Sequence, residues 1–408
     1  MRNSNRVIGA AAGLAILIGA IPALAQDSAQ WRGTNRDGKV AGFTAPQTWP
    51  KEFVQKWKVT VGSGDATPAL VGDRLYVFTR QGGDEVTLCL DAKDGNVIWQ
   101  DKYATGAVTG AAARHPGPRG SPTVADGKVV TLGVNGVLSC LDAKEGKMLW
   151  RKEDIKGAPQ FFTAMSPIVV DGLCIAHLGG RDNGTVAAYT LDKGEQKWTW
   201  KGEGPSYSSP ALLTVDGTKM VVLMTDKSVV GLGAADGALL WQVPFAPMGR
   251  MGYNAATPIV EGTTVILAGQ GRGTKALQIA KEGDKFAAKE VWSNRTGPVF
   301  NTSVLKDGLL YGLSDKGNLY CLNTAKKGET AWTGTAALKN FGAILDVGPF
   351  LLALPDSGEL LVFKPSDKQY EEVAKIKVAS SATYAHPVVA GKRIFVKDAD
   401  SLTMWTVD

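Results

Sequence analysis

Histidine and cysteine are scarce in this sequence, which has three histidines and four cysteines among 408 residues. No two cysteines are adjacent, and no Cys-Xaa-Xaa-Cys-His haem-attachment motif occurs. The histidines, His115, His177 and His386, are far apart in the chain. The spacing of these residues therefore indicates no metal centre, and no constellation supports a Ser-His-Asp hydrolase.

Clustered positive charge and long hydrophobic runs are missing as well. Lys plus Arg number 45 against 39 Asp plus Glu, and no run of Lys or Arg occurs. Nucleic-acid binders concentrate such charge on one face, so we expect no nucleic-acid partner. After residue 25 no stretch is apolar enough to span a membrane, which takes about 20 residues.

Glycine, in contrast, is abundant. It accounts for 49 of 408 residues, about 12% against roughly 7% in an average protein. Apolar residues make up 44% of the chain, enough to form a large core, so disordered and collagen-like chains are excluded. The composition favours a globular, turn-rich and β-rich protein.

The first 25 residues have the pattern of a secretory signal peptide. Arg2 and Arg6 precede an apolar stretch over Val7–Ile21, and the small-residue motif Ala23-Leu24-Ala25 comes before Gln26. We predict cleavage near Ala25 and a periplasmic or secreted protein. No cysteine lies near the cleavage point, so a lipid anchor has no attachment residue.

One phrase recurs along the rest of the chain: a Leu-Asp-Ala turn, then Gly, three residues and Trp. It is complete over residues 90–99 and 141–150. The step from Gly to Trp returns at Gly194/Trp198, Gly237/Trp241 and Gly328/Trp332, and a stretched copy ends at Trp292. Repetition at a fixed period is typical of propellers and solenoids.

A second phrase, Ser or Thr followed by Pro and later by an acidic residue and Gly, marks the start of each unit. Its copies begin at Ser121, Ser166, Ser209 and Thr257, with looser versions at Thr67, Thr302 and His386. Asp-Gly between apolar runs predicts a tight hairpin. Units begin near residues 67, 121, 166, 209, 257, 302, 343 and 386, and this period suits a four-stranded propeller blade.

The last unit is too short for four strands, but the missing strand is available at the other end of the chain. Phe53–Val61 carries Trp57 at the position of the repeat Trp. We therefore predict an all-β, eight-bladed β-propeller of four-stranded antiparallel blades, the last blade closed by the N-terminal strand. Its domains are a signal peptide (1–25), an N-terminal extension (26–50) and the propeller (51–408). The seventh unit, Gly342–Val378, lacks the Gly-to-Trp phrase.

The repeated tryptophans and the cysteines are interpreted as core residues. A Trp that recurs at one position of each unit suits docking between blades rather than binding of a ligand. Cys89, Cys140 and Cys321 also occupy one equivalent position, so they should lie beyond the roughly 7 Å Cα separation that a disulfide tolerates. We expect them, and Cys174, to be buried free thiols.

The repeats resemble those of the pyrroloquinoline-quinone (PQQ)-type propellers, whose outer-strand signature matches residues 90–99 and 141–150. The resemblance covers residues 57–408, and the head Gln30-Trp31-Arg32-Gly33 is similar to that of secreted bacterial proteins of this group. It implies an eight-bladed propeller. Members include quinoprotein alcohol dehydrogenases and the non-catalytic BamB-type scaffold of outer-membrane assembly, so the fold alone does not choose a function.

Candidate ligand-binding residues come from the segments that lead from one blade into the next, which meet at the mouth of the central channel. The candidates are Arg119, Tyr207, Tyr253, Asn254, Arg295, Asn301 and His386. Arg114, His115, Phe161, Phe162, Arg250, Phe300 and Tyr384 lie in the same segments. Aromatic residues and Arg are enriched in recognition surfaces. The alternative is that these side chains plug a narrow channel.

Two classes of function follow. The leading interpretation is a non-catalytic, cofactor-free binding or scaffold module, monomeric, that holds a protein or another extracytoplasmic ligand at the channel mouth. The alternative is a PQQ-dependent quinoprotein dehydrogenase with Ca²⁺, for which Asp65, Asn254 and Asn301 could supply oxygen ligands, although no motif selects them. Such dehydrogenases usually carry long insertions and an adjacent cysteine pair, and both are missing here. The sequence thus leans towards a protein that is not an enzyme.

Overall fold

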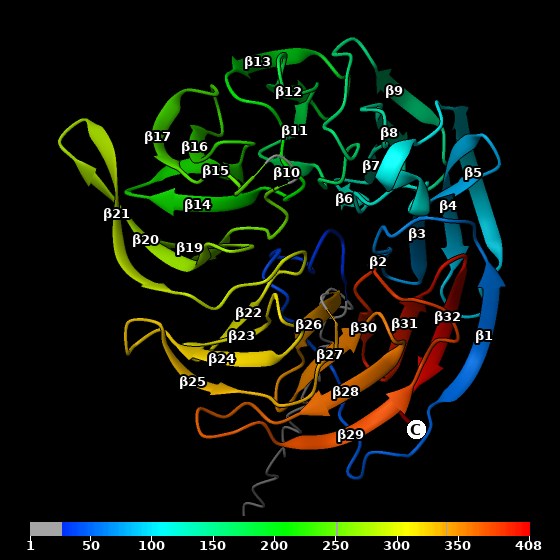
Figure 1. Cartoon of the computed structure of the whole chain (residues 1–408). Coiled ribbons are helices and arrows are strands. Elements are labelled where there is room, and N and C mark those ends of the chain that lie inside the picture. Colours follow the sequence, from blue (N-terminus) through cyan, green and yellow to red (C-terminus); the bar gives the residue numbers. More distant parts are fainter. Residues whose placement is uncertain (1–26, 250–251, 340) are drawn as a thin grey trace, which may run out of the picture.

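The computed structural model describes residues 27–249, 252–339 and 341–408. The predicted signal peptide and Arg250 lie outside these described residues. Within them the chain forms eight four-stranded antiparallel sheets, arranged as the blades of a ring (Figure 1). The inner strands of neighbouring blades contact one another around the central channel. The predicted eight-bladed propeller is confirmed.

The first four blades follow the chain in order, from the channel outwards. Blade 1 contains β2 (Ala69–Val71), β3 (Arg74–Gln81), β4 (Asp84–Asp91) and β5 (Val97–Ala104); blade 2 contains β6 (Thr123–Ala125), β7 (Lys128–Leu132), β8 (Leu138–Asp142) and β9 (Met148–Lys152); blade 3 contains β10 (Ile168–Val170), β11 (Leu173–Leu178), β12 (Thr185–Thr190) and β13 (Gln196–Lys201); blade 4 contains β14 (Ala211–Val215), β15 (Thr218–Met224), β16 (Ser228–Gly233) and β17 (Leu239–Pro244). A short 3₁₀ helix over Gly110–Arg114 lies between blades 1 and 2.

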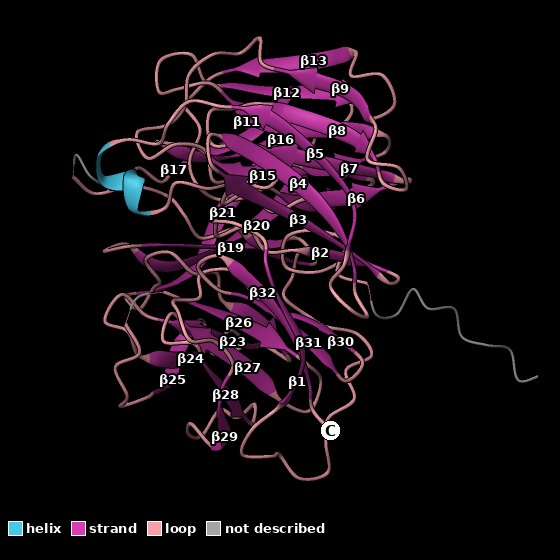
Figure 2. Cartoon of the chain, turned by 90° about the vertical axis from the view of Figure 1, so that its right-hand side faces the viewer, coloured by secondary structure: helices cyan, strands magenta, loops and turns pink. Residues whose placement is uncertain are grey.

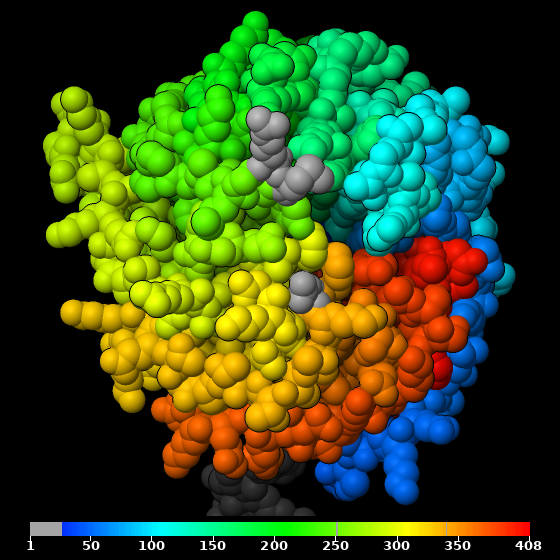
Figure 3. Space-filling view, in the orientation of Figure 1, coloured from blue at the N-terminus to red at the C-terminus, as the bar shows by residue number. Residues whose placement is uncertain are grey.

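The last four blades follow the same plan. Blade 5 contains β18 (Ile259–Glu261), β19 (Thr264–Gly269), β20 (Gly273–Glu282) and β21 (Lys285–Asn294); blade 6 contains β22 (Val304–Lys306), β23 (Leu309–Leu313), β24 (Leu319–Asn323) and β25 (Glu329–Thr333); blade 7 contains β26 (Gly342–Asp346), β27 (Leu351–Pro355), β28 (Glu359–Phe363) and β29 (Glu372–Lys377); blade 8 contains β30 (Val388–Ala390), β31 (Arg393–Lys397), β32 (Ser401–Thr406) and β1 (Val54–Thr60). The ten-residue strands β20 and β21 project beyond the ring (Figure 3).

The Asp-Gly pairs form the tight hairpins that the sequence predicts. In blade 2, Ala125 pairs with Lys128 across the turn, and Asp126 and Gly127 have φ angles of 48° and 71°. Two successive positive φ angles define the type I′ turn, which matches the twist of the flanking strands.

A repeated Trp packs between neighbouring blades at most blade junctions. Trp99 of blade 1 donates an indole hydrogen bond to the Ala143 carbonyl of blade 2 at 3.2 Å, and Trp150 donates to the Leu191 carbonyl of blade 3 at 2.9 Å. A Cβ atom placed on Gly146 would lie 2.5 Å from the Trp99 ring. The Gly of the phrase therefore makes room for the Trp of the preceding blade.

The ring closes through the two ends of the chain. β1 pairs with β32, with Trp57 opposite Met404, so the predicted closure is confirmed. Blade 7 is complete, but Ala374 occupies the position of the repeat Trp, opposite Val362. Larger side chains fill this region instead, and they include Phe53 with Trp49 and Phe350 packed around it.

All four cysteines are buried free thiols, as predicted. Cys89, Cys140 and Cys321 each pair across the sheet with the repeat Trp of their own blade. This register confirms that the three positions are equivalent.

The Ser or Thr that opens each unit has a structural role that its sequence pattern did not reveal. Its hydroxyl group accepts a hydrogen bond from the backbone N–H at the same position of the preceding blade. The chain of bonds runs from His386 to Thr67, Ser121, Ser166, Ser209, Thr257 and Thr302, with donor–acceptor distances of 2.9–3.3 Å. It ties seven blades together around the channel.

The segment that precedes β1 (blue in Figure 1) crosses the central channel of the ring. The guanidinium group of Arg32 donates to the carbonyls of Thr302 and Ser303, and that of Arg36 donates to the carbonyls of Ser166 and Pro167. Both arginines are buried. This segment, predicted as an extension ahead of the propeller, thus packs into the channel of the ring.

Seen from the side, the ring is a thick disc with its 3₁₀ helix on one face (Figure 2). In the part of the chain that the structure describes, no helix has the length and apolar character needed to cross a bilayer.

Candidate functional site: the channel mouth

A cavity of about 560 Å³ opens at the centre of the ring. Each connection from an outer strand to the next inner strand contributes to its wall, as the sequence predicts for a channel mouth. Trp31, from the N-terminal segment, also lines the cavity. Its indole N–H donates to the Thr257 hydroxyl at 3.0 Å. The N-terminal segment crosses the channel, so the cavity is a blind funnel.

Seven rings from seven different connections form a continuous set around the funnel, which we call the aromatic arc. It consists of Phe161, Tyr207, Tyr253, Phe300, Phe341, Tyr384 and His115. The Phe300 and Phe341 rings are stacked with centroids 4.2 Å apart, and Tyr384 meets His115 edge-on at 4.7 Å. Offset and edge-on contacts are the favourable arrangements for aromatic rings, so the arc forms a defined surface.

The charged groups of the funnel lie at one side of the arc. The Asp65 carboxylate is 2.7 Å from Nδ1 of His115. Arg119 donates to the backbone carbonyls of His115 and Phe161 and forms no ion pair with the described residues. Burial lowers the pKa of Arg119, while the nearby Asp65 carboxylate raises it. The guanidinium is therefore a partly desolvated positive charge that has the Asp65 carboxylate nearby but no direct ion pair among the described residues.

The tyrosines of the arc are neutral at physiological pH. Burial raises the pKa of Tyr253 to about 12 and also raises that of Tyr207. The Tyr207 hydroxyl accepts a hydrogen bond from the backbone N–H of Phe161 at 2.9 Å. Tyr207 thus holds its neighbour in the arc and presents an apolar ring with a polar edge.

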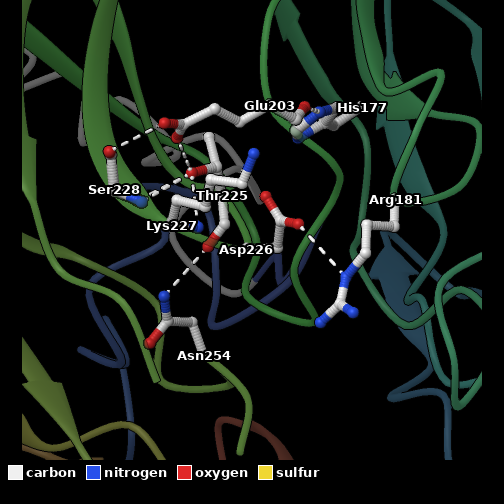
Figure 4. Close-up of polar contacts among 8 residues, drawn as sticks. All are labelled: His177, Arg181, Glu203, Thr225, Asp226, Lys227, Ser228 and Asn254. Atoms are coloured by element: carbon white, nitrogen blue, oxygen red, sulfur yellow. Dashed lines mark hydrogen bonds and ion pairs between the residues drawn. The ribbon is translucent and has the colours of Figure 1, made fainter. Parts of the chain in front are cut away.

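Two of the predicted site residues are turned into the protein. Asn254 donates to the Thr225 carbonyl at 2.9 Å (Figure 4) and to the Phe245 carbonyl at 3.1 Å. Asn301 donates to the Leu313 carbonyl at 2.9 Å. Both side chains are buried, and both hold the connection that carries an arc residue, Tyr253 or Phe300.

Figure 4 shows the polar cluster next to Asn254. The Glu203 carboxylate accepts hydrogen bonds from the hydroxyl groups of Thr225 and Ser228, and His177 contacts the Glu203 carbonyl at 2.9 Å. These bonds fix the turn between β15 and β16. Because Asn254 donates to the Thr225 carbonyl in this turn, the cluster also holds the connection that carries Tyr253.

The other predicted residues are divided between the funnel and its surroundings. Arg119, Tyr207 and Tyr253 line the cavity. His386 is buried against Trp31, with ring centroids 4.5 Å apart, and Arg295 is exposed at the end of β21. Ligand binding by all seven candidates remains a prediction.

Trp31 and Phe341 line the funnel but were missed as candidates. Phe341 is the last residue before β26, in the position of the other mouth segments, and this place in the repeat could have identified it. Trp31 precedes the first blade, and its position depends on contacts with blades far along the chain, such as its bond to Thr257. Only the head motif around Trp31 gave a signal.

The alternative function requires that the funnel hold Ca²⁺ and a quinone. Ca²⁺ takes six to eight oxygen ligands, usually including several carboxylates. Among the described residues that line the funnel, Asp65 supplies the single carboxylate, and it is already paired with His115. No group of three or more His, Cys, Asp and Glu side chains suited to a metal occurs in the described ranges. The lining is therefore a poor match for that cofactor.

Comparison with solved structures supports the fold. The structure is similar to BamB from Moraxella catarrhalis, with a TM-score of 0.66 and 16% identity over 87% of this chain and 99% of that one. It is also similar to the quinohemoprotein alcohol dehydrogenase from Comamonas testosteroni, with a TM-score of 0.71 and 14% identity over 94% of this chain and 80% of the other. Likeness at these identities shows the propeller and does not separate the two functions.

Sequence comparison, unlike the structural comparison, favours BamB proteins over the quinoprotein dehydrogenases. The chain is 25% identical to the outer membrane protein assembly factor BamB of Burkholderia pseudomallei over 368 residues, which cover 85% of this chain and 86% of that protein. The family model described as outer membrane protein assembly factor BamB matches residues 36–182 and 104–334. These matches span most of the ring, and the chain therefore belongs to the BamB family of PQQ-type repeat propellers.

Proposed function

We propose that this protein is a non-catalytic assembly factor that works outside the cytoplasm and binds a protein of the outer-membrane assembly machinery at its channel mouth. Membership of the BamB family, over most of the chain, supports this role. The signal-peptide pattern of residues 1–25 supports a periplasmic location.

The observation that carries the proposal is the aromatic arc. Its rings come from seven connections and are of three residue types, Phe, Tyr and His, whereas the docking position is Trp in most blades. Aromatic anchors beside a partly desolvated Arg are typical of binding hot spots. Recognition through the arc and Arg119 needs no cofactor.

Site-specific photo-crosslinking in living cells tests this function. A photoreactive residue at Tyr207, within the arc, should crosslink to an outer-membrane assembly protein. The same residue at Lys193, in an exposed turn between β12 and β13, is the control and should give no such product. Crosslinks from Lys193 but none from Tyr207 would contradict binding at the mouth.

The dehydrogenase alternative has a direct test of its own. Purified protein mixed with PQQ and Ca²⁺ should bind no stoichiometric chromophore and should not reduce a dye when an alcohol or a sugar is added. Substrate-dependent dye reduction that a chelator abolishes would reverse the assignment.

A further inference from the structure

Two shallow depressions adjoin the funnel and extend it across the mouth. The first, of about 660 Å³, lies over the connections around blade 2 and shares Ala111 and Phe161 with the funnel. The second, of about 510 Å³, lies beside blade 5 and shares Tyr253 and Gln270 with it. Because each shares part of its wall with the funnel, the three spaces form one surface, which we call the mouth trough.

The two ends of the trough are lined differently from its centre. Gly110 lines the first depression and Gly249 lines the second, and no atom of the described residues lies within 4 Å of the place that a Cβ atom would take on either one. Glycine allows another backbone to approach closely. The ends of the trough therefore suit a main chain, whereas the aromatic funnel suits a bulky side chain.

The backbone at Phe162 supports a functional role for this surface. Phe162 has a φ angle of 64°, a left-handed conformation that is strained for a bulky residue and is concentrated at functional sites. Its ring packs on a small apolar cluster with Val108 and Val134. Phe162 thus anchors the turn, and the adjacent Phe161 reaches the funnel.

Among the described side chains that line the trough, positive charges outnumber negative ones. Arg119 in the funnel and Arg272 in the second depression form no ion pair in the ranges that the structure describes. Arg272 lies over the Phe245 ring at 4.2 Å, and its buried Nε atom has no hydrogen-bond partner among the described residues. The Asp65 carboxylate, which is bonded to His115, offsets part of the Arg119 charge and leaves that of Arg272. A ligand that carries carboxylates would complement this surface.

We propose that the mouth trough binds an extended polypeptide segment of the partner, with one aromatic side chain in the funnel and acidic residues beside Arg119 and Arg272. This inference rests on the proposed function and specifies its partner. A compact small molecule would occupy the funnel and leave the glycine-lined ends empty. An extended segment uses all three spaces, the close backbone approach and both positive charges.

A capped, fluorescein-labelled peptide tests the proposal. The probe is Gly-Ser-Asp-Gly-Phe-Gly-Glu-Ser-Gly, and its binding to the purified protein is followed by fluorescence anisotropy. Replacing its Phe with Ala should weaken binding by about tenfold, the effect of losing a single buried anchor. Replacing Asp and Glu with Asn and Gln should weaken binding by about three- to tenfold.

Variants of the protein locate the binding site. Arg272→Gln and Tyr253→Ala should each weaken binding of the Phe peptide by about three- to tenfold. Lys147→Gln removes one exposed positive charge from the turn that precedes β9 and should leave the affinity unchanged. Thermal melts of all variants show whether each one is folded.

Three results would overturn the proposal: equal affinity for the Phe and Ala peptides, no peptide binding by a folded protein, or equally effective competition by N-acetyl-phenylalanine amide. The crosslinking from Tyr207 is independent of these measurements. If a partner crosslinks there while no peptide binds, the partner presents a folded surface, so the extended segment is wrong and the proposed function stands.

Discussion

The rim of the ring and the mouth of its channel are built on opposite plans. At the rim, one contact repeats from blade to blade, as in the Trp99 and Trp150 bonds to the carbonyls of the following blade. At the mouth, equivalent connections present different side chains, such as His115, Phe161 and Tyr207. Repetition marks the residues on which the fold depends. Variation within a fixed frame marks the residues that are available for recognition.

Blade 7 shows that even the rim contact can be replaced. Ala374 stands where most blades have Trp, and the neighbouring core gains Trp49 and Phe53 from the segment ahead of the ring. The requirement at the rim is therefore buried volume between blades. The Trp meets this requirement most often, and the N-terminal segment meets it once.

The largest expected effect comes from the rim. Trp150→Ala should lower the free energy of unfolding by about 3–5 kcal/mol, because it removes a buried aromatic side chain and its hydrogen bond. Trp200→Ala is the matched control, since Trp200 is half-buried and lies outside the repeat position. Denaturant unfolding measures both losses. Equal losses would mean that the repeat position has no special role.

His386 offers a second test of the comparison between core and mouth. It lies in a segment that leads into the mouth, but its side chain is buried like a core residue. Burial lowers its pKa to about 3, below the ordinary value of about 6.5. Between about pH 3 and pH 6.5, His386 is therefore protonated in the unfolded chain and neutral in the folded protein. The stability that neutral His386 contributes is complete above pH 6.5 and decreases as the pH falls towards 3.

Unfolding measured between pH 7 and pH 4 checks this sign. His386→Phe keeps a ring against Trp31 and removes the titrating group, so its stability should fall less steeply with acid than that of the wild type. His177, whose pKa burial lowers to about 4, remains in both proteins and contributes equally. Parallel pH profiles for the two proteins would show that His386 does not titrate as described.

A substitution at the mouth should reduce partner binding more than stability, whereas a substitution at the rim should reduce stability. Arg119→Glu should weaken capture of the partner by about tenfold or more, since it reverses a partly desolvated charge at the centre of the site. Its effect on the melting temperature should be small compared with that of Trp150→Ala. Pull-down from periplasmic extract and a thermal melt measure the two effects. A large loss of stability with normal capture would assign Arg119 to the core.

Arg295→Glu should give the smallest effect. Its side chain is exposed beyond the funnel, and exposed substitutions usually change stability by less than about 0.5 kcal/mol. We expect unchanged melting and a modest loss of capture through its charge. Capture at the wild-type level would limit the binding surface to the funnel and its trough.

The ring could be predicted from the sequence because the same contact between neighbouring blades recurs and leaves the same residues at the same spacing. The Gly-to-Trp phrase reports two contacting positions, as Gly146 and Trp99 show, and the shared blade follows from counting strands. The site was harder to predict, because the direction of each side chain depends on long connections without a repeat. Asn254 and Asn301 were expected at the mouth, but their amides satisfy backbone carbonyls within it.

The pairing of β1 with β32 also sets the order in which this protein can be completed. Trp57 and Met404 are neighbours in one sheet although about 350 residues separate them. A chain that emerges from its N-terminus exposes Trp57 long before its partner strand exists, and such non-local pairing is slow and prone to aggregation. Loss of β32 should therefore reduce the stability of blade 8 as much as loss of β1. We expect a chain that lacks either strand to keep an open sheet edge in blade 8 and to aggregate more readily.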